Sequence, residues 1–350
     1  MKVHALIDFT FICSVLALPQ AENNDKHVDT TITSAGNNSS EILAVFDDNG
    51  NVVPLNTSET NPETLEETQD KLKSSIFFYL HTKKTVDNPE LLYLNNVDSV
   101  KNSHFDPKKE TKFVTHGWMN SRNSPSCTLV VSAFVTHGDY NIIVTDWSAI
   151  SIMPYIWSSN RVVMVAQYVS KMIDFLVSQG MNTSQVTSVG HSLGGHVAGL
   201  AAYYAKTKVN YVVALDPAEP NFLLSGPDGR VSAEDAAFVE VIHTNGGLEG
   251  FLNALGHADF FPNGGSAQKG CIVDIGGSCS HLRSVQYYAE SINSKVGFVA
   301  KSCSSYQNYT LGLCDSNPDG LMGGAEPNFK LKGKYYLNTN GQSPFAKGAK

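Results

Sequence analysis

The 350-residue sequence lacks the features that mark several classes of protein. It has no excess of positive charge, because 25 Lys and Arg stand against 33 Asp and Glu, and the net charge of −8 argues against a nucleic-acid-binding protein. Beyond its first residues it has no apolar run of the ~18 residues that a membrane-spanning helix needs. No Cys-x-x-Cys spacing occurs among its six cysteines, so the sequence does not favour a metal cluster. A disordered chain is also excluded, because 42% of the residues are hydrophobic and only 17% are charged.

The first 21 residues resemble a secretory signal peptide. Lys2 provides a basic start, an apolar run follows at 9–18, and Ala17 or Ala21 offers a small residue before a cleavage point. The alternative, an apolar N-terminal strand, is disfavoured by the polar stretch that follows. A signal peptide at 1–21 predicts a secreted, extracellular protein, in which paired cysteines form disulfides.

Residues 22–73 differ from the rest of the chain in charge and composition. They hold 11 Asp and Glu against 3 Lys, whereas residues 74–350 hold 21 basic and 21 acidic residues. Many Asn, Thr and Ser and few aromatic residues are typical of a disordered segment. We therefore expect an acidic, disordered leader or pro-segment at 22–73, either inhibitory or a passive glycosylated tail. One folded domain is expected at 74–350.

Apolar runs of strand length alternate with helical stretches after residue 74. The runs lie at 76–80, 112–115, 142–145, 185–189, 211–215 and 238–242. The helical stretches lie at 162–177, 194–205 and 281–292. This alternation predicts an α/β fold with a mostly parallel central sheet and helices on both faces.

The strongest chemical signal is the segment Gly190-His191-Ser192-Leu193-Gly194. It follows an apolar strand and precedes a helix rich in Ala and Gly, which is the context of a nucleophile elbow. In such an elbow, a turn too tight for side chains at the glycines projects the serine oxygen above the sheet edge, at the positive end of the helix. A purely structural turn is the alternative, which the flanking strand and helix disfavour.

A serine hydroxyl needs a general base and an orienting acid to become a nucleophile. In α/β hydrolases the acid follows the serine in the chain and the histidine comes last. Asp216 ends the apolar run at 211–215 and precedes Pro217, so we expect it to be the acid, with a loop-capping aspartate as the alternative. The rival aspartates do not directly follow a comparable strand: Asp235, Asp259 and Asp274.

His281 is the expected base among 11 histidines. It follows Cys279 and begins a predicted helix, so a disulfide and a helix start would both fix its backbone. The other histidines of the folded region that we considered lie too close to Ser192 along the chain or flank strands, and we interpret them as packed or hydrogen-bonded: His191, His196, His243 and His257.

Two backbone N–H groups are expected to bind the oxyanion of the reaction intermediate. Leu193 directly follows the serine and supplies one of them. An apolar strand leads into His116-Gly117-Trp118, and the N–H of Trp118 is expected to be the second donor.

These segments together resemble the pancreatic-type lipase family of animals, which includes lipoprotein lipases and the phospholipases A1 of insects. They occur in the family's order across 74–345: THGW (115–118), TDW (145–147), GHSLGGHVAG (190–199), ALDPAEP (214–220), FVEVIHT (238–244), HADFFPNGG (257–265) and CSHLRSVQYYAES (279–291). The resemblance implies the α/β-hydrolase fold and a triad of Ser192, Asp216 and His281. It also implies the disulfides Cys271–Cys279 and Cys303–Cys314, which leave Cys127 as a buried thiol.

Two departures from the family pattern bear on partners and metals. Only 69 residues follow His281, so we expect no C-terminal β-sandwich domain and no colipase-type partner. Near 230–235, where the family has a calcium site, Ser232 stands where an acid is expected and only Asp235 remains. We therefore expect no required metal.

A short lid is the third departure. Cys271 and Cys279 enclose seven residues, of which the large apolar ones are Ile272, Val273 and Ile275. The opposite wall, at 245–256, contains four glycines. The family's triacylglycerol lipases have longer lids and its phospholipases A1 have short ones, so we expect an open trough that admits a phospholipid head group.

The sequence therefore predicts a secreted serine esterase that acts on lipids at a membrane, micelle or droplet surface without a cofactor. We expect phospholipase A1 activity, with triacylglycerol or galactolipid hydrolysis as the alternative. An inactive lipid-binding or yolk-type storage protein is the alternative from another class. Asn182 and Asn308 lie in candidate glycosylation motifs. The oligomeric state is left open.

Overall fold

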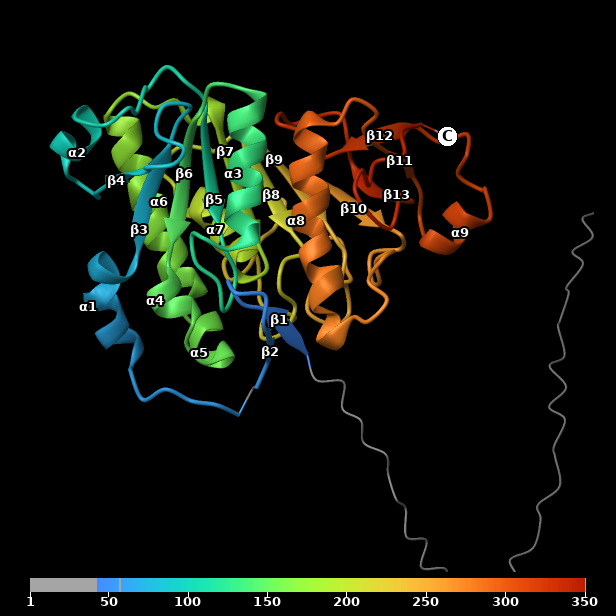
Figure 1. The fold of residues 1–350 in the computed structure, drawn as a ribbon, viewed down its shortest axis with the longest axis horizontal. Coiled ribbons are helices and arrows are strands. Elements are labelled where there is room, and N and C mark those ends of the chain that lie inside the picture. Colours follow the sequence, from blue (N-terminus) through green and yellow to red (C-terminus); the bar gives the residue numbers. More distant parts are fainter. Residues whose placement is uncertain (1–42, 57, 350) are drawn as a thin grey trace, which may run out of the picture. The chain divides into compact units, whose positions relative to one another are not determined.

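A large central sheet forms the framework of the computed structural model, which describes residues 43–56 and 58–349 (Figure 1). In this part of the chain the sheet has eleven strands in the order β12-β11-β13-β10-β9-β8-β7-β5-β6-β3-β4. The strands from β13 to β6 in this order run parallel, and the outer strands are antiparallel to their neighbours. Their bounds are β3 (Phe77–His81), β4 (Glu90–Leu92), β5 (Thr111–Thr115), β6 (Asn141–Asp146), β7 (Val186–His191), β8 (Tyr211–Leu215), β9 (Phe238–Ile242), β10 (Ala258–Pro262), β11 (Phe298–Ser302), β12 (Asp319–Met322) and β13 (Gly333–Leu337).

Helices cover both faces of this sheet, as the alternating pattern predicts. Every residue of β5 to β10 is buried, which is typical of parallel strands between two helical layers. Successive residues of a strand enter opposite cores: Phe113 packs with α6 and α7, and Val114 with α3 and α8. The helices are α1 (Leu65–Ser75), α2 (Val97–Lys101), α3 (Pro125–His137), α4 (Ser148–Ser151), α5 (Tyr155–Ser159), α6 (Val162–Ser178), α7 (Leu193–Tyr204), α8 (Ser278–Asn293) and α9 (Tyr306–Thr310).

The α/β-hydrolase fold expected from the sequence is confirmed by this architecture. The six strand-length runs fall on β3 and β5 to β9, and the three helical stretches fall on α6, α7 and α8. Both expected disulfides, Cys271–Cys279 and Cys303–Cys314, are present. Cys127 is a buried free thiol, and burial raises its pKa. Within the described ranges, no helix is both long and apolar enough to cross a membrane.

The expectation of disorder through residue 73 is wrong for the described part of the leader. Residues Ala44–Phe46 (β1) and Val52–Pro54 (β2) form a hairpin, and α1 begins at residue 65. Asp47 Oδ1 accepts N–H bonds from Asn49 (2.9 Å) and Asn51 (2.8 Å) in the hairpin turn. Such aspartate-centred turns and a capping box at the start of α1 let a polar, acidic sequence fold. The predicted signal peptide at 1–21 and the predicted leader up to residue 42 lie outside the described residues.

Candidate active site

Ser192 lies on a sharp turn between β7 and α7. Its backbone has φ 58° and ψ −127°, a strained conformation for a residue other than glycine. The turn requires glycine on both sides, since a Cβ at Gly190 would collide with the carbonyl oxygen of Gly194, and a Cβ at Gly194 with that of His116. The segment therefore has the backbone of a nucleophile elbow, with the serine at the start of a helix.

Asp216 and His281 form a close hydrogen-bonded pair. Asp216 directly follows β8, and its Oδ2 accepts a bond of 2.6 Å from His281 Nδ1. Its Oδ1 accepts the N–H groups of Thr244 (2.8 Å) and Asn245 (3.0 Å). Because both oxygens are engaged and the residue is fully buried, the carboxylate has one orientation, which fixes the imidazole plane.

His281 lies in the first turn of α8, directly after the lid disulfide. Asp274 Oδ1 accepts the N–H of Cys279 at 2.8 Å, so the segment before the histidine is held at both ends. Burial alone would lower the pKa of His281, but the neighbouring carboxyls of Glu249 and Asp216 outweigh burial and raise it. Among the described residues, His281 Nε2 has no hydrogen-bond partner, and its closest charged neighbour is Glu249 Oε2 at 3.5 Å.

The rival histidines have structural partners. His196 Nε2 donates to the carbonyl of Ala218 at 2.6 Å, and its Nδ1 accepts the N–H of Val231. His243 has both ring nitrogens engaged, by the Phe251 carbonyl and Asp259. The ring of His191 lies 4.4 Å from that of His281, and burial lowers the pKa of His191 well below its usual range, so it stays neutral beside the pair.

The loop after β5, which carries Trp118, lies directly against the serine. A Cβ at Gly117 would lie 2.7 Å from Ser192 Cβ, so only glycine permits this contact. The backbone N–H groups of Trp118 and Leu193 have no acceptor among the described residues. The indole N–H of Trp118 donates to the Met153 carbonyl at 2.7 Å, which fixes this loop.

The β1–β2 hairpin covers the serine. Val45 and Phe46 line a cavity of about 20 Å³ that also touches Ser192 and His281, which is room for about one water molecule. The Phe46 carbonyl accepts a bond of 2.9 Å from Asn120 Nδ2, so the hairpin is attached to the loop that carries Trp118. In Figure 1 the hairpin lies at the lower edge of the sheet, beside one end of α8.

Sequence reasoning missed Val45 and Phe46. A usable signal is present, because short apolar stretches flank the turn residues Asp-Asp-Asn-Gly at 47–50, a typical hairpin pattern. The acidic composition of the surrounding fifty residues obscured it.

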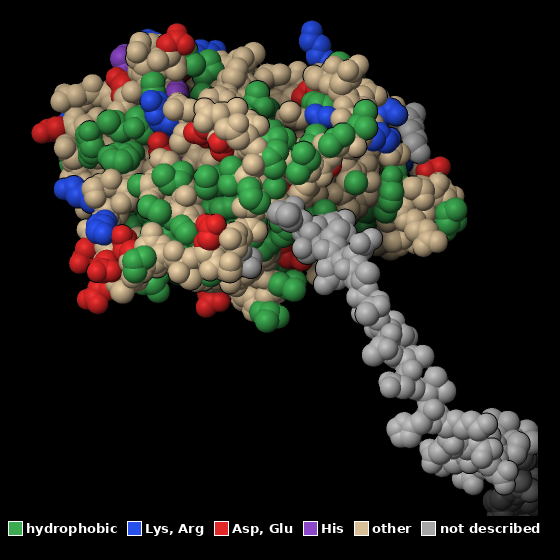
Figure 2. Space-filling model, turned by 60° about the horizontal axis from the view of Figure 1, so that its bottom comes forward, with side chains coloured by type: hydrophobic (Ala, Val, Ile, Leu, Met, Phe, Trp, Pro, Cys, Tyr) green, Lys and Arg blue, Asp and Glu red, His purple; other side chains and the backbone are tan. Residues whose placement is uncertain are grey.

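The residues predicted to form a lid are strongly exposed. Ile272, Val273 and Ile275 are 95%, 76% and 57% exposed. The Cys271–Cys279 disulfide attaches this segment to the first turn of α8. Other exposed leucines on loops after β8 and β9 are Leu223, Leu224, Leu248 and Leu252. Figure 2 shows one face of the molecule, over which hydrophobic side chains are spread, with Lys and Arg mostly near its edges.

The remaining predicted positions have local partners. Asp235 accepts the N–H (2.9 Å) and hydroxyl (3.0 Å) of Ser232, and burial raises the pKa of Asp235 to about 7. Within the described ranges, no group of three or more His, Cys, Asp and Glu side chains could hold a metal.

The two candidate glycosylation sites differ in exposure. Asn182 is exposed before a short 3-10 turn, and Asn308 lies half-buried in α9.

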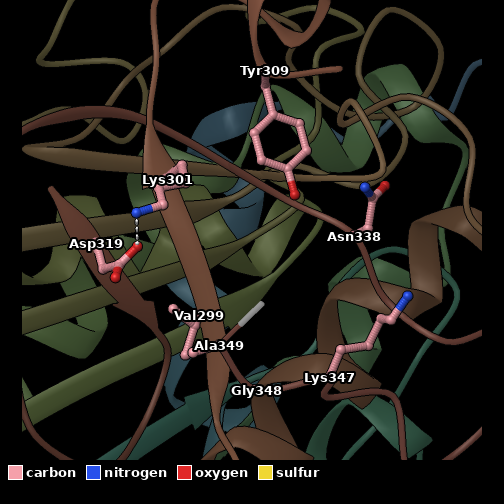
Figure 3. A pocket seen from close by; sticks show the side chains of 8 residues that line it. All are labelled: Val299, Lys301, Tyr309, Asp319, Asn338, Lys347, Gly348 and Ala349. Atoms are coloured by element: carbon pink, nitrogen blue, oxygen red, sulfur yellow. Dashed lines mark ion pairs between the residues drawn. The ribbon is translucent and has the colours of Figure 1, made fainter. Parts of the chain in front are cut away.

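A larger cavity of about 210 Å³ lies away from the serine, between β11, β12 and the C-terminal segment (Figure 3). Inside it, Lys301 and Asp319 form an ion pair of 2.8 Å. Its lining residues do not include Ser192, Asp216 or His281, so this cavity is separate from the candidate active site.

A known protein family covers most of this chain. The family model described as Lipase matches residues 40–345, a range that includes the hairpin and α1. Inactive pancreatic lipase-related protein 1 of Homo sapiens is 33% identical over 302 residues, which are 77% of this chain and 64% of that protein. Pancreatic triacylglycerol lipase of Ictidomys tridecemlineatus is 33% identical over 301 residues, with the same shares.

Among solved structures, an esterase of Pyrobaculum calidifontis is 14% identical with a TM-score of 0.27, over 50% of this chain and 70% of that one. The chain spans 64% of the length of the two curated relatives. The family match over residues 40–345 is the decisive finding. The chain therefore belongs to the lipase family.

Proposed function

We propose that the chain is a carboxylic ester hydrolase of lipids, with Ser192 as nucleophile, His281 as general base and Asp216 as the acid that orients the histidine. The supporting observation is the bond of 2.6 Å between Asp216 and His281 beside a cavity that both Ser192 and His281 line. Ser192 itself sits on the elbow that exposes a serine oxygen to an acyl carbon.

The proposed reaction has two steps, acylation of Ser192 and hydrolysis of the acyl-enzyme. Ser192 Oγ forms a bond to the acyl carbon while His281 Nε2 takes its proton, and the oxyanion accepts the N–H groups of Trp118 and Leu193. The carbonyl then re-forms, the ester C–O bond breaks, and the leaving alkoxide takes the proton from His281. Water repeats these steps on the acyl-enzyme and releases the fatty acid. Asp216 stabilises the imidazolium throughout, and no cofactor takes part.

For the substrate we propose the sn-1 ester of phospholipids. The support is the short lid, whose large apolar residues are Ile272, Val273 and Ile275, all largely exposed. Triacylglycerol hydrolysis fits equally well, because relatives at 33% identity are named pancreatic triacylglycerol lipases, and galactolipids are a further alternative. We also propose secretion, from the signal-like residues 1–21 and the two disulfides, and action at a lipid surface without a colipase-type partner.

An inactive lipid-binding role is the competing proposal. One relative at 33% identity is named as inactive, and His281 Nε2 has no hydrogen-bond partner among the described residues. The test is the rate of hydrolysis of p-nitrophenyl butyrate by the wild type and by Ser192→Ala. We expect wild-type activity that the variant lacks, and equal rates would refute the enzyme proposal.

Substrate class is decided by a second assay. Phosphatidylcholine and a long-chain triacylglycerol are compared across the micelle threshold, and the position of the released acyl chain is determined. Release from the sn-1 position of phosphatidylcholine without a jump in rate at the threshold supports phospholipase A1. A sharp jump with triacylglycerol alone refutes it.

A further inference from the structure

A third carboxyl lies beside His281, on the loop between β9 and β10. The side chain of Glu249 is only 3% exposed, and its Oε2 lies 3.5 Å from His281 Nε2. Among the described residues, neither of its oxygens has a hydrogen bond of normal geometry, and the backbone N–H of Ala44 lies near enough to favour its charged form. No motif of the sequence drew attention to this residue.

The position of Glu249 is determined by its backbone. Its N–H donates to Asn245 Oδ1 at 3.0 Å, and its carbonyl accepts the N–H of Glu219 at 2.8 Å. Asn245 is itself bonded to Asp216. The same loop therefore supports the acid of the triad and directs a second carboxyl toward the other side of the imidazole.

Burial of this carboxyl is unfavourable in free energy, because few partners offset its lost hydration. A carboxylate without hydrogen bonds in the interior loses its hydration, and glutamate is almost never fully buried unless it is paired. Burial raises the pKa of Glu249, the positive form of His281 opposes this rise by favouring the carboxylate, and Asp216 adds to the rise. The only described group of opposite sign at close range is the imidazole of His281.

We propose that Glu249 is a positioning residue for the reaction, which holds the Nε2 side of His281 while the site is covered and sets the pH range in which His281 serves Ser192. This inference rests on the proposed function. Nδ1 of His281 is already bound to Asp216, so Glu249 and Ser192 compete for the one remaining ring nitrogen. His281 must leave Glu249 before it can take the serine proton.

The charges around His281 define the expected direction of the pH effect. Asp216 follows β8, Glu249 lies on the β9–β10 loop and Asp274 precedes η2 (Ile275–Gly277), and each favours the protonated imidazole. His191, at the end of β7, is neutral because burial lowers its pKa. Tyr155 of α5 is also neutral, since burial and Glu249 raise its pKa. Glu249 and His281 therefore titrate as a coupled pair, and removal of the carboxyl lowers the pH at which the imidazole releases its proton.

The decisive variant is Glu249→Gln, which keeps the shape of the side chain and removes its charge. We expect the acidic limb of the kcat/KM profile on p-nitrophenyl butyrate to move down by about one pH unit, a tenfold gain in rate on that limb. The titration of the His281 ring nitrogens, followed by ¹⁵N NMR, is expected to move by the same amount. This second readout requires no turnover.

The matched control is Glu240→Gln on β9. Glu240 is also buried, but its oxygens are bonded by the Tyr211 hydroxyl (3.0 Å) and the Gly323 N–H (2.7 Å). We expect this variant to leave the His281 titration within about 0.2 pH unit of the wild type. If Glu249→Gln does not fold, Glu249→Leu serves in its place, because apolar replacement of a buried charge is often tolerated.

Two outcomes overturn the proposal. An unchanged His281 titration in a folded Glu249 variant shows that the carboxyl does not act on the imidazole. A change in melting temperature alone, with the same pH profile, shows a purely structural role. Failure of the proposed function is distinct, because it appears as equal rates for the wild type and Ser192→Ala, and the NMR titration still decides whether Glu249 holds His281.

Discussion

The covered serine leads to a specific prediction about the β1–β2 hairpin. A cavity of about 20 Å³ is far smaller than the roughly 300–1,000 Å³ of typical ligand pockets. An acyl chain therefore cannot reach Ser192 while Val45 and Phe46 occupy their present positions. We predict that Asp48→Ala, which loosens the hairpin, increases the accessibility of Ser192.

The magnitude follows from the contacts of Asp48. Its carboxylate accepts the N–H of Ser121 at 3.0 Å and also the Ser121 hydroxyl. Both bonds are exposed, so their loss amounts to about 1 kcal/mol in total. Removal of about 1 kcal/mol from the closed state increases the open fraction about fivefold.

The assay is the rate at which an organophosphorus reagent labels Ser192, measured by mass spectrometry. The control is Asp70→Ala on α1, because Asp70 is an exposed aspartate that lies away from the hairpin in the chain. We expect about fivefold faster labelling for Asp48→Ala and wild-type labelling for the control. Slower labelling would refute the reasoning, since it would mean that the hairpin supports the loop of Trp118 rather than covering the serine.

Three further predictions concern the triad, the lid and a buried acid. Asp216→Asn should lower kcat on p-nitrophenyl butyrate by about 10⁴-fold with little change in melting temperature, because the imidazolium loses its compensating charge. Replacement of Cys271 and Cys279 by Ala should lower kcat/KM more than the melting temperature, because the bridge closes a short loop that leads into His281, the proposed general base; a large stability loss with normal activity would contradict this. Burial raises the pKa of Glu240 from 4.5 to about 7, so the folded state binds this proton more tightly and stability falls as the pH rises through that range. Thermal melts at both pH limits should show Glu240→Gln gaining stability relative to the wild type as the pH rises, and a constant difference would argue against it.

The elements that were predicted correctly depend on local sequence. The elbow at Ser192 follows from glycines within two residues of it, because a Cβ at Gly190 or Gly194 would collide with backbone. The central strands follow from continuous apolar runs that only a sheet covered on both faces can bury. Asp216 was singled out because it directly follows such a run, and His281 because it follows a cysteine at the start of a helix; the structure brings the two side chains together.

The hairpin was missed because composition was averaged over too long a segment. Residues 22–73 are acidic as a whole, yet Ala44 and Val45 are buried and the aspartates beside them form the turn. A disordered composition and a short folded hairpin can coexist in one segment, since a hairpin of this size needs only a few buried side chains and a surface to pack on. Here that surface is α8 and η2, which the local sequence does not reveal.

The sequence by itself determined the strand and helix pattern, the nucleophile turn and the order of serine, acid and histidine, because neighbouring residues decide these features through sterics and apolar spacing. Only the tertiary structure decided that Glu249 faces His281 and that Val45 and Phe46 cover Ser192. The position of Glu249 depends on the β9–β10 loop packing against the ends of β8 and α8, and the cover depends on β1 reaching the same edge. Such contacts join segments distant in sequence, and their energy comes from burial and charge in a shared interior rather than from any local pattern.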